Sequence, residues 1–309
     1  MIPLLKVENL KLHIPHCGKE PLHCVNGLSF EITQGEILGI VGVPGSGKTS
    51  LAHGLMGLFS KNLAYTSGDI RVEGHSVLEL APKAMRRKIR AHKIALFPQQ
   101  ASQILPPTRH IASFARDVLR AHYPEMSRAQ MDARLRERIE QLDQTANTLD
   151  QYPSELSPLL RTITALGIST LLNPLVLIAD APGAELNAAD QKIVLENLDR
   201  LLHQEVVHSL ILLDRQFSIL QSRATRIATL FCGEFVEVGF AEQLLQDPRH
   251  PCTKAMLQSS ENQFPSSNGQ GDRGCHYVSF CPMAQSDCHN VHQSMRTVGD
   301  RDVRCMYAK

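Results

Sequence analysis

Residues 42–49 form a glycine-rich loop that could hold the phosphates of a nucleotide. The segment reads GVPGSGKT and fits the pattern G-x-x-x-x-G-K-[ST]. Glycines let backbone N–H groups turn toward phosphate oxygens, and the N-terminus of a following helix adds a positive dipole. The loop follows the aliphatic run ILGIV, which disfavours the alternative of an ordinary surface turn. We therefore expect a nucleotide to bind here, through Gly42, Gly45, Ser46, Gly47, Lys48, Thr49 and Ser50.

A second group of chemical interest follows another aliphatic run further along the chain. Residues 175–187 read LVLIADAPGAELN, so a buried strand would end on Asp180. Such a carboxylate suits the Mg²⁺ side of a nucleotide site, with the Thr49 hydroxyl as a second ligand. The position directly after it is Ala181, which has no group that could activate water.

Four of the eight cysteines crowd the end of the chain, at Cys275, Cys281, Cys288 and Cys305. In a reducing compartment such a set indicates metal or cluster ligands more than disulfides. The spacing is wider than the C-x2–4-C pairs common in zinc sites, but zinc stays an alternative. The neighbouring His276 and His289 are expected to be solvated.

Composition limits the classes of function. The chain has 309 residues, is 43% hydrophobic and 20% charged, and carries a net charge of +1. This balance argues against a protein that holds nucleic acid electrostatically. We find no pattern of a signal peptide at the start and no run near the ~18 apolar residues of a membrane span. We expect a cytosolic chain.

The elements that must position these residues follow from the apolar patterns. We expect strands at 4–14, 27–32, 36–43, 93–99, 175–180 and 208–214, a pair of strands around a glycine turn at 225–239, and a strand leading into a helix at 70–80. Residues 108–150 read as helical. Met131, Leu135, Ile139 and Leu142 share one face, and Ser127 is a suitable N-cap. A polar linker spans 259–274.

Several short motifs, in this order, resemble those of a known family. After the glycine-rich loop come FPQQ around Gln99, YPSELS at 152–157, LVLIADAP, HPCTKAML at 250–257, and cysteines spaced C-x5-C-x6-C-x16-C. Together they resemble the ATP-binding subunits of ABC transporters, within the oligopeptide/dipeptide importer group. The resemblance implies an α/β P-loop NTPase fold with an antiparallel β subdomain and a helical subdomain at about 100–165. The ABC nucleotide-binding domain would span 1–258, and the linker with a cysteine-rich extension 259–309.

The resemblance also implies cofactors and partners. ATP and Mg²⁺ would bind at the glycine-rich loop, with Gln99 sensing Mg²⁺ and the attacking water and Ser157 standing in the signature loop. The cysteine tail would hold a [4Fe-4S] cluster. The subunit would form a heterodimer with a second ABC ATPase subunit under two transmembrane permeases. It would be peripheral on the cytoplasmic face of the inner membrane and depend indirectly on an extracytoplasmic binding protein.

The chain departs from the family pattern where catalysis would occur. Ala181 stands at the position of the catalytic glutamate, and Arg215 at that of the switch histidine, so no catalytic residue is assigned. The signature loop reads LSPLL, with Pro158 and Leu159 in place of glycines, and Asn187 replaces an aspartate. The stretch before the phosphate loop, 13–25, has no Phe, Tyr or Trp to stack on adenine. These departures predict a subunit that binds Mg-ATP and hydrolyses it poorly.

Two other readings remain open at this stage. The chain could be a working ATP hydrolase of the same importer class, with a base supplied by neighbouring residues. It could also be an ATP-sensing regulatory protein that has no permease. The transported substrate cannot be read from this chain, because the permeases and the binding protein select it.

Overall fold

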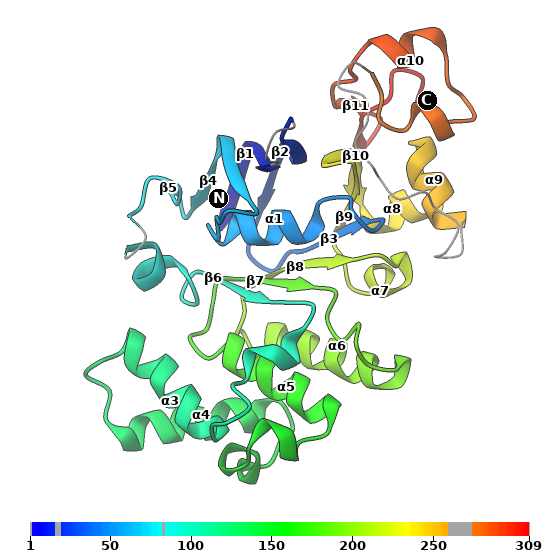
Figure 1. Ribbon diagram of the computed structural model, residues 1–309. Coiled ribbons are helices and arrows are strands. Elements are labelled where there is room, and N and C mark those ends of the chain that lie inside the picture. Colours follow the sequence, from blue (N-terminus) through cyan, green and yellow to red (C-terminus); the bar gives the residue numbers. More distant parts are fainter. Residues whose placement is uncertain (1, 16–19, 82–83, 259–273, 309) are drawn as a thin grey trace. The chain divides into compact units, whose positions relative to one another are not determined.

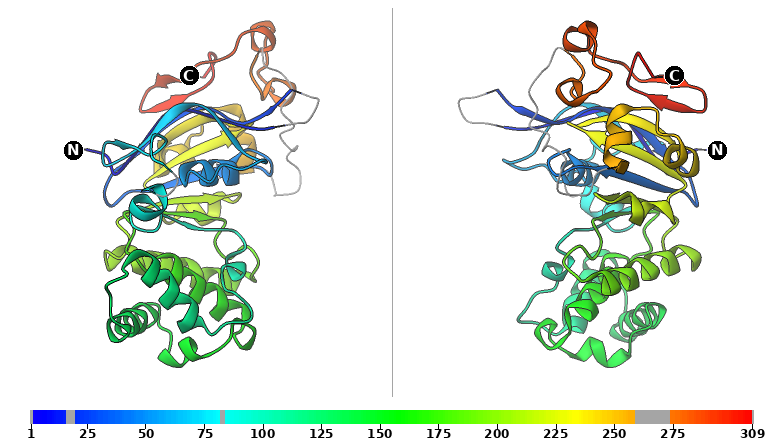
Figure 2. Two further views of the ribbon diagram at one scale, coloured as in Figure 1. Left: turned by 60° about the vertical axis from the view of Figure 1, so that its left-hand side comes forward. Right: turned by 90° about the vertical axis from the view of Figure 1, so that its right-hand side faces the viewer.

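The computed structural model describes residues 2–15, 20–81, 84–258 and 274–308. These residues form two compact units, shown in Figures 1 and 2. Unit 1 comprises Met1–Glu79 and Ile211–Lys309, and unit 2 comprises Leu80–Leu210. The glycine-rich loop and the cysteine tail lie in unit 1, whereas Gln99, Ser157 and Asp180 lie in unit 2.

One antiparallel sheet of unit 1 has the strand order β2-β1-β4-β5. Its strands are β1 (Leu5–Ile14), β2 (Leu22–Ile32), β4 (Ala64–Val72) and β5 (His75–Ser76). Alternate apolar residues of β1, such as Leu10 and Leu12, are completely buried, as the period of two predicts. The expected strand at 4–14 is confirmed. The strand expected at 70–80 begins earlier, at Ala64, and ends at Val72. The Glu73–Gly74 turn, where both residues have positive φ, then leads into β5, where a helix was expected.

The other sheet of unit 1 carries the chemistry. Its order is β11-β12-β10-β9-β3, with β8 on the other side of β3. The strands are β3 (Ile37–Gly42), β8 (Ser209–Asp214), β9 (Arg226–Phe231), β10 (Glu234–Phe240), β11 (Arg296–Val298) and β12 (Arg301–Val303). β3 and β9 run parallel, while β10 pairs antiparallel with β9. The expected glycine turn between β9 and β10 is Cys232–Gly233, where both residues have positive φ, as in the tight turns of hairpins.

The helices of unit 1 are short. They are α1 (Lys48–Leu55), α7 (Phe217–Gln221), α8 (Ala241–Gln246), α9 (Pro251–Gln258), α10 (Ser286–Asn290) and the 3₁₀ turn Val278–Phe280. α1 packs closely on β1, since a Cβ added at Gly54 would lie 2.4 Å from Leu12 Cδ1. This close approach fixes the helix that follows the glycine-rich loop against the antiparallel sheet.

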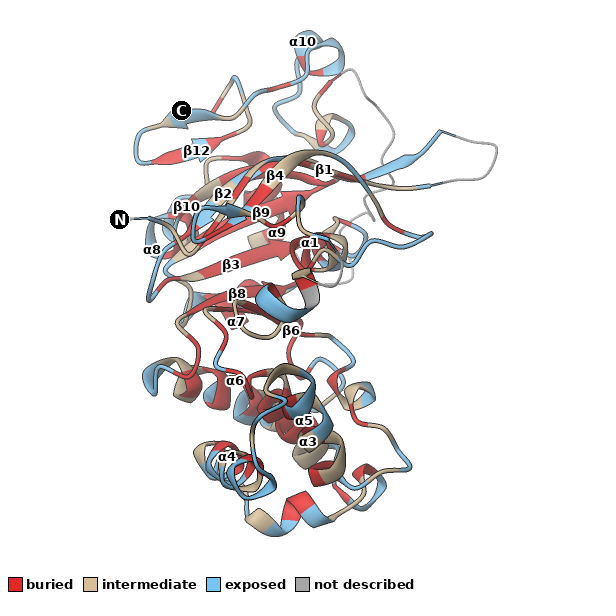
Figure 3. Ribbon diagram, turned by 90° about the vertical axis from the view of Figure 1, so that its left-hand side faces the viewer, coloured by how far each residue is buried: buried red, intermediate tan, exposed pale blue. Residues whose placement is uncertain are grey.

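Unit 2 contains two parallel strands and four longer helices. The strands are β6 (Ile94–Phe97) and β7 (Val176–Asp180), and the helices are α3 (Ile111–His122), α4 (Arg128–Gln141), α5 (Pro158–Ser169) and α6 (Ala188–His203). Shorter turns are Met85–Ile89, Ala101–Ile104, Ala146–Asp150 and Pro153–Glu155. Ser127 caps α4 in a capping box with Gln130, as expected. The predicted apolar face of α4 is buried, as Figure 3 illustrates for this unit.

None of the helices in the described ranges is long and apolar enough to cross a membrane.

Candidate nucleotide-binding site

The glycine-rich loop links the end of β3 to the start of α1. Gly45 and Gly47 have φ values of 78° and 107°, which residues with a Cβ rarely adopt. A Cβ at Gly47 would lie 2.1 Å from the carbonyl oxygen of Cys24, and one at Gly42 would lie 2.4 Å from Ser46 Oγ. Gly47 is therefore required both by φ and by close backbone approach, Gly45 by φ, and Gly42 by close approach.

The lysine of this loop is buried against loop oxygens. Lys48 Nζ donates hydrogen bonds to the carbonyls of Gly42 (2.6 Å) and Val43 (3.1 Å) and lies 3.3 Å from Ser46 Oγ. The ammonium group is thus held against the backbone of the loop, while Gly45 and Thr49 are exposed to solvent. A phosphate that enters the loop would meet a positioned positive charge and the N-terminus of α1.

The β9–β10 turn and strand β2 support the phosphate loop through backbone hydrogen bonds. The Gly233 N–H, in the β9–β10 turn, donates to the carbonyl of Ser46 (2.9 Å). The Gly233 carbonyl accepts from the N–H of Asn26 in β2 (2.8 Å). The phosphate loop is therefore bonded to the β9–β10 turn, which is in turn bonded to β2 of the antiparallel sheet.

A buried carboxylate near Lys48 was not identified from the sequence. Asp214 ends β8, is 4% exposed, and accepts the N–H groups of Arg215 (2.6 Å) and Gln216 (3.0 Å). Burial raises the pKa of Asp214, while these hydrogen bonds and the charge of Lys48 act in the opposite direction. The sequence did contain a sign of this buried carboxylate, because Asp214 ends the aliphatic run LILLD as Asp180 ends the aliphatic run LVLIAD. Arg215 itself is exposed.

In unit 2, the structure brings Gln99 and Asp180 to one edge of a strand pair. β6 and β7 are parallel, and Phe97 pairs with Ala179. Asp180 ends β7 and is 4% exposed, whereas Gln99 is exposed just beyond the end of β6. The carboxyl ends of parallel strands are where ligands bind in open α/β sheets.

These observations can be compared with known proteins. Residues 25–184, just over half of the chain, match the family model of the ABC transporter. The chain belongs to the ABC transporter family. Residues 236–288 also match the C-terminal region of oligopeptide/dipeptide transporters, a segment that includes three of the four tail cysteines.

Two curated relatives resemble this ABC protein over nearly their full length. One is the dipeptide transport ATP-binding protein DppD of Haemophilus influenzae, 30% identical over 98% of this chain and 94% of the relative. A putative peptide import ATP-binding protein of Brucella abortus is also 30% identical, with the same coverage. Among solved structures, the dimeric ATP-binding cassette MJ0796 bound to ADP and Pi aligns with a TM-score of 0.67 and 20% identity. It covers 77% of this chain and 98% of its own, and confirms the expected P-loop NTPase fold.

The position after Asp180 in this ABC protein is structurally unusual. Ala181 is 7% exposed and has a φ of 45°, in the left-handed region. Its methyl group can neither accept a proton nor orient a water molecule. Asn187, further along the same loop, caps α6 by accepting the Asp190 N–H (3.0 Å).

The signature segment begins α5. Ser157 is the N-cap, and its Oγ accepts the Leu160 N–H (3.3 Å). Pro158 occupies the first helical position, where its missing N–H breaks no hydrogen bond within the helix. The substitution thus suits the helix, while it removes one N–H donor that a bound phosphate could have used.

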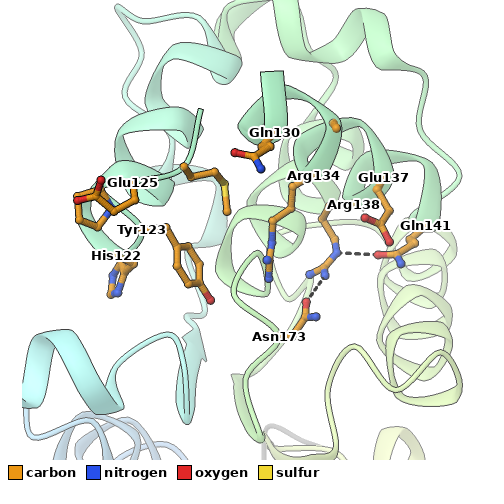
Figure 4. A pocket seen from close by; sticks show the side chains of 12 residues that line it. His122, Tyr123, Glu125, Gln130, Arg134, Glu137, Arg138, Gln141 and Asn173 are labelled. Atoms are coloured by element: carbon orange, nitrogen blue, oxygen red, sulfur yellow. Dashed lines mark hydrogen bonds between the residues drawn. The ribbon is translucent and has the colours of Figure 1, made fainter. Parts of the chain in front are cut away.

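Unit 2 also has a pocket that none of the motif residues lines. It has a volume of about 760 Å³ and lies along α4 (Figure 4). Arg138 donates there to Gln141 Oε1 (2.9 Å) and Asn173 Oδ1 (2.6 Å), and Arg134 lies 5.5 Å from the centre of the Tyr123 ring. Burial lowers the pKa of Arg138 to about 10, so this guanidinium stays charged at neutral pH. The pocket has no glycine-rich loop and is not a nucleotide site of the P-loop type.

Proposed function

We propose that this chain is the ATP-binding subunit of a peptide-type ABC importer, and that it binds Mg-ATP with little or no hydrolysis of its own. One observation carries the proposal: an intact phosphate loop with a buried, positioned Lys48 occurs in the same chain as Ala181 directly after Asp180. The relatives named as dipeptide and peptide import proteins support the substrate class.

Binding of Mg-ATP would use the phosphate loop and the residues predicted for the Mg²⁺ side. Gly42, Gly45, Ser46, Gly47, Lys48, Thr49 and Ser50 would contact the phosphates. Thr49, Gln99 and Asp180 would act on the Mg²⁺ side, since hydroxyl, amide and carboxylate oxygens are the ligands this ion prefers. The nucleotide-binding domain would comprise residues 1–258, with its helical subdomain at about 100–165. The cysteine-rich extension would comprise residues 259–309.

If the partner ATPase subunit has the complete family motifs, the substitutions in this chain affect two different ATP sites, each formed by the phosphate loop of one subunit and the signature loop of the other. ATP on this chain's phosphate loop lacks a base at Ala181 and meets Arg215, which cannot transfer a proton at neutral pH. ATP on the partner's loop meets this chain's signature, where Pro158 and Leu159 replace glycines. Both sites are expected to turn over slowly, the first more so.

In this proposal the chain forms a heterodimer with a second ABC ATPase subunit and docks under two permeases. It would lie peripherally on the cytoplasmic face of the inner membrane, with the extracytoplasmic binding protein as an indirect partner. The dimeric state of MJ0796 supports pairing of such cassettes.

The proposal is tested in the intact complex, purified with its permeases. ATP at this chain's phosphate loop should stay ATP while the partner's site turns over. Rapid conversion to ADP at both sites would instead favour an active hydrolase, and failure of any permease to co-purify would favour a regulatory protein.

We further propose that the extension holds a [4Fe-4S] cluster, with zinc as the alternative. The chain's own residues suit such a group, because Cys275, Cys281, Cys288 and Cys305 line one pocket and form no disulfide. Burial and the neighbouring thiolates raise the pKa of Cys275 and Cys281, a cost that a bound metal would offset. When bound, the cluster would supply a cross-link between segments distant in sequence, and we assign it no part in hydrolysis.

Replacing Cys281 with serine is expected to remove iron and the visible absorbance of the cluster from protein purified without oxygen. Each thiolate is one of four ligands, and serine is a poor one for iron. The matched control is Cys24→Ser, at a buried cysteine outside the four-cysteine pocket, which should retain the full iron content. Iron-free protein with one zinc bound by the cysteines would contradict the cluster and support the alternative.

A further inference from the structure

Glu234, His276 and His292 bring metal-ligating atoms together in unit 1. One such atom from each residue lies within 4.8 Å of the other two. None of the three residues lines the four-cysteine pocket. His276 was expected to be solvated, but its side chain is only 12% exposed and faces the carboxylate of Glu234. The expectation for His276 is therefore wrong, because the extension folds it against the start of β10.

We infer that this cluster binds zinc or a similar divalent metal ion, at a site separate from the tail cysteines. Two imidazoles and one carboxylate form a ligand set that zinc takes in proteins, with a fourth position left to water. The side chain of His292 is 43% exposed, so solvent reaches the site and can supply that water.

One of the two histidine–carboxylate distances fits a shared ion better than a hydrogen bond. His276 Nε2 lies 3.6 Å from Glu234 Oε2, beyond the 2.7–3.2 Å range of an N–H···O hydrogen bond. That separation matches the spacing of about 3.3–3.5 Å between ligand atoms that are each about 2.0–2.1 Å from a tetrahedral zinc. His292 Nε2 lies 2.7 Å from Oε1, a hydrogen-bond distance, so this exposed ring would have to move for both groups to bind one ion.

The carboxylate is already held in place by an outer set of contacts. Glu234 is 2% exposed, and Asn26 Nδ2 donates to its Oε1 (2.9 Å). Arg304 Nε lies 3.7 Å from Oε2 but donates to the carbonyl of Phe235 (2.9 Å), and Nη1 donates to that of Gln293 (2.7 Å). The guanidinium opposes a cation electrostatically, yet its hydrogen bonds go to backbone carbonyls, and Oε1 can bind a metal while it still accepts from Asn26. Such outer contacts orient metal-ligating carboxylates.

The position of the site suggests what the metal would join. His276 and His292 belong to the extension, whereas Glu234 begins β10. Glu234 directly follows Gly233, whose N–H holds the Ser46 carbonyl of the phosphate loop. The metal would therefore fasten the extension to the turn that supports the phosphate loop.

The test is zinc and cobalt(II) binding to the full chain, measured as bound metal per chain and by visible spectroscopy. His292→Ala should hold one zinc fewer than the unaltered chain, with affinity at this site lowered at least about 100-fold. The matched control is His289→Ala, at an exposed histidine of the same extension, which should bind as the unaltered chain does. Glu234→Gln, which keeps the shape and the Asn26 contact, should lose the same zinc.

Cobalt(II) separates this site from the cysteines. The difference spectrum between the unaltered chain and His292→Ala should contain ligand-field bands without thiolate-to-metal charge transfer. Equal zinc content in the unaltered chain and His292→Ala would overturn the inference. So would a difference spectrum dominated by thiolate charge transfer, because the lost metal would then have been bound by cysteines. A common loss in His289→Ala would show a general disturbance of the extension and also overturn it.

Discussion

Replacing Ala181 with glutamate is expected to raise ATP hydrolysis at this chain's phosphate loop by about 10²-fold, equal to about 2.7 kcal/mol of barrier. A carboxylate at this position, next to Asp180, could orient and polarise the attacking water. The gain is placed at the low end of what a positioned base supplies, since Arg215 still occupies the switch position. The left-handed backbone at Ala181 adds no new strain, because alanine and glutamate both carry a Cβ there.

This experiment needs a silent partner and an isosteric control. Hydrolysis should be measured in the assembled complex after the partner's own base has been removed, so that turnover comes from this chain's loop. Ala181→Gln has the same length as the glutamate but cannot take a proton, and should stay at the level of the unaltered chain. Equal gains in both variants would point to a packing effect, and a high rate in the unaltered chain would show that another residue already acts as base.

Replacing Lys48 with alanine is expected to weaken Mg-ATP binding by at least about 100-fold, or about 2.7 kcal/mol. Lys48 is buried, held by the carbonyls of Gly42 and Val43, and placed at the N-terminus of α1. Loss of a buried, hydrogen-bonded charge that meets a phosphate commonly costs this much or more. Titration calorimetry or nucleotide fluorescence with the purified chain measures the change directly.

The control for this variant is Lys61→Ala, at an exposed lysine of the same unit, which should bind Mg-ATP as the unaltered chain does. Thermal unfolding without nucleotide should be compared in parallel, since Lys48 also contacts the loop in the free protein. A Lys48→Ala chain that folds normally and keeps its ATP affinity would rule out the phosphate loop as the binding site.

The strands and the phosphate loop could be predicted because their signals are local. The aliphatic runs before Gly42 and Asp180 fix buried parallel strands, and the glycine pattern fixes the turn between β3 and α1. α4 was predicted from one apolar face and the cap at Ser127. In each case the residues that determine the structure are close together in the sequence, within about one strand or two helical turns.

Other features depend on contacts between residues far apart in sequence. α5 was not predicted, because most of its residues are buried, so it lacks a polar face, and Pro158 at its start resembles a loop residue. Asp214 gains its place beside Lys48 only when β8 and β3 become neighbours. The meeting of Glu234 with His276 and His292 spans more than 40 residues and a segment outside the described ranges, so spacing alone gave no sign of it.

The most direct test of a subunit that binds ATP without hydrolysing it is the fate of the nucleotide on its own loop. Labelled Mg-ATP is loaded onto the complex of this chain with its partner ATPase subunit and permeases, in a single turnover. The nucleotide cross-linked to each subunit is then identified over time. We predict that this chain retains ATP long after the partner's nucleotide has become ADP. Conversion on this chain at the partner's rate would contradict the proposal.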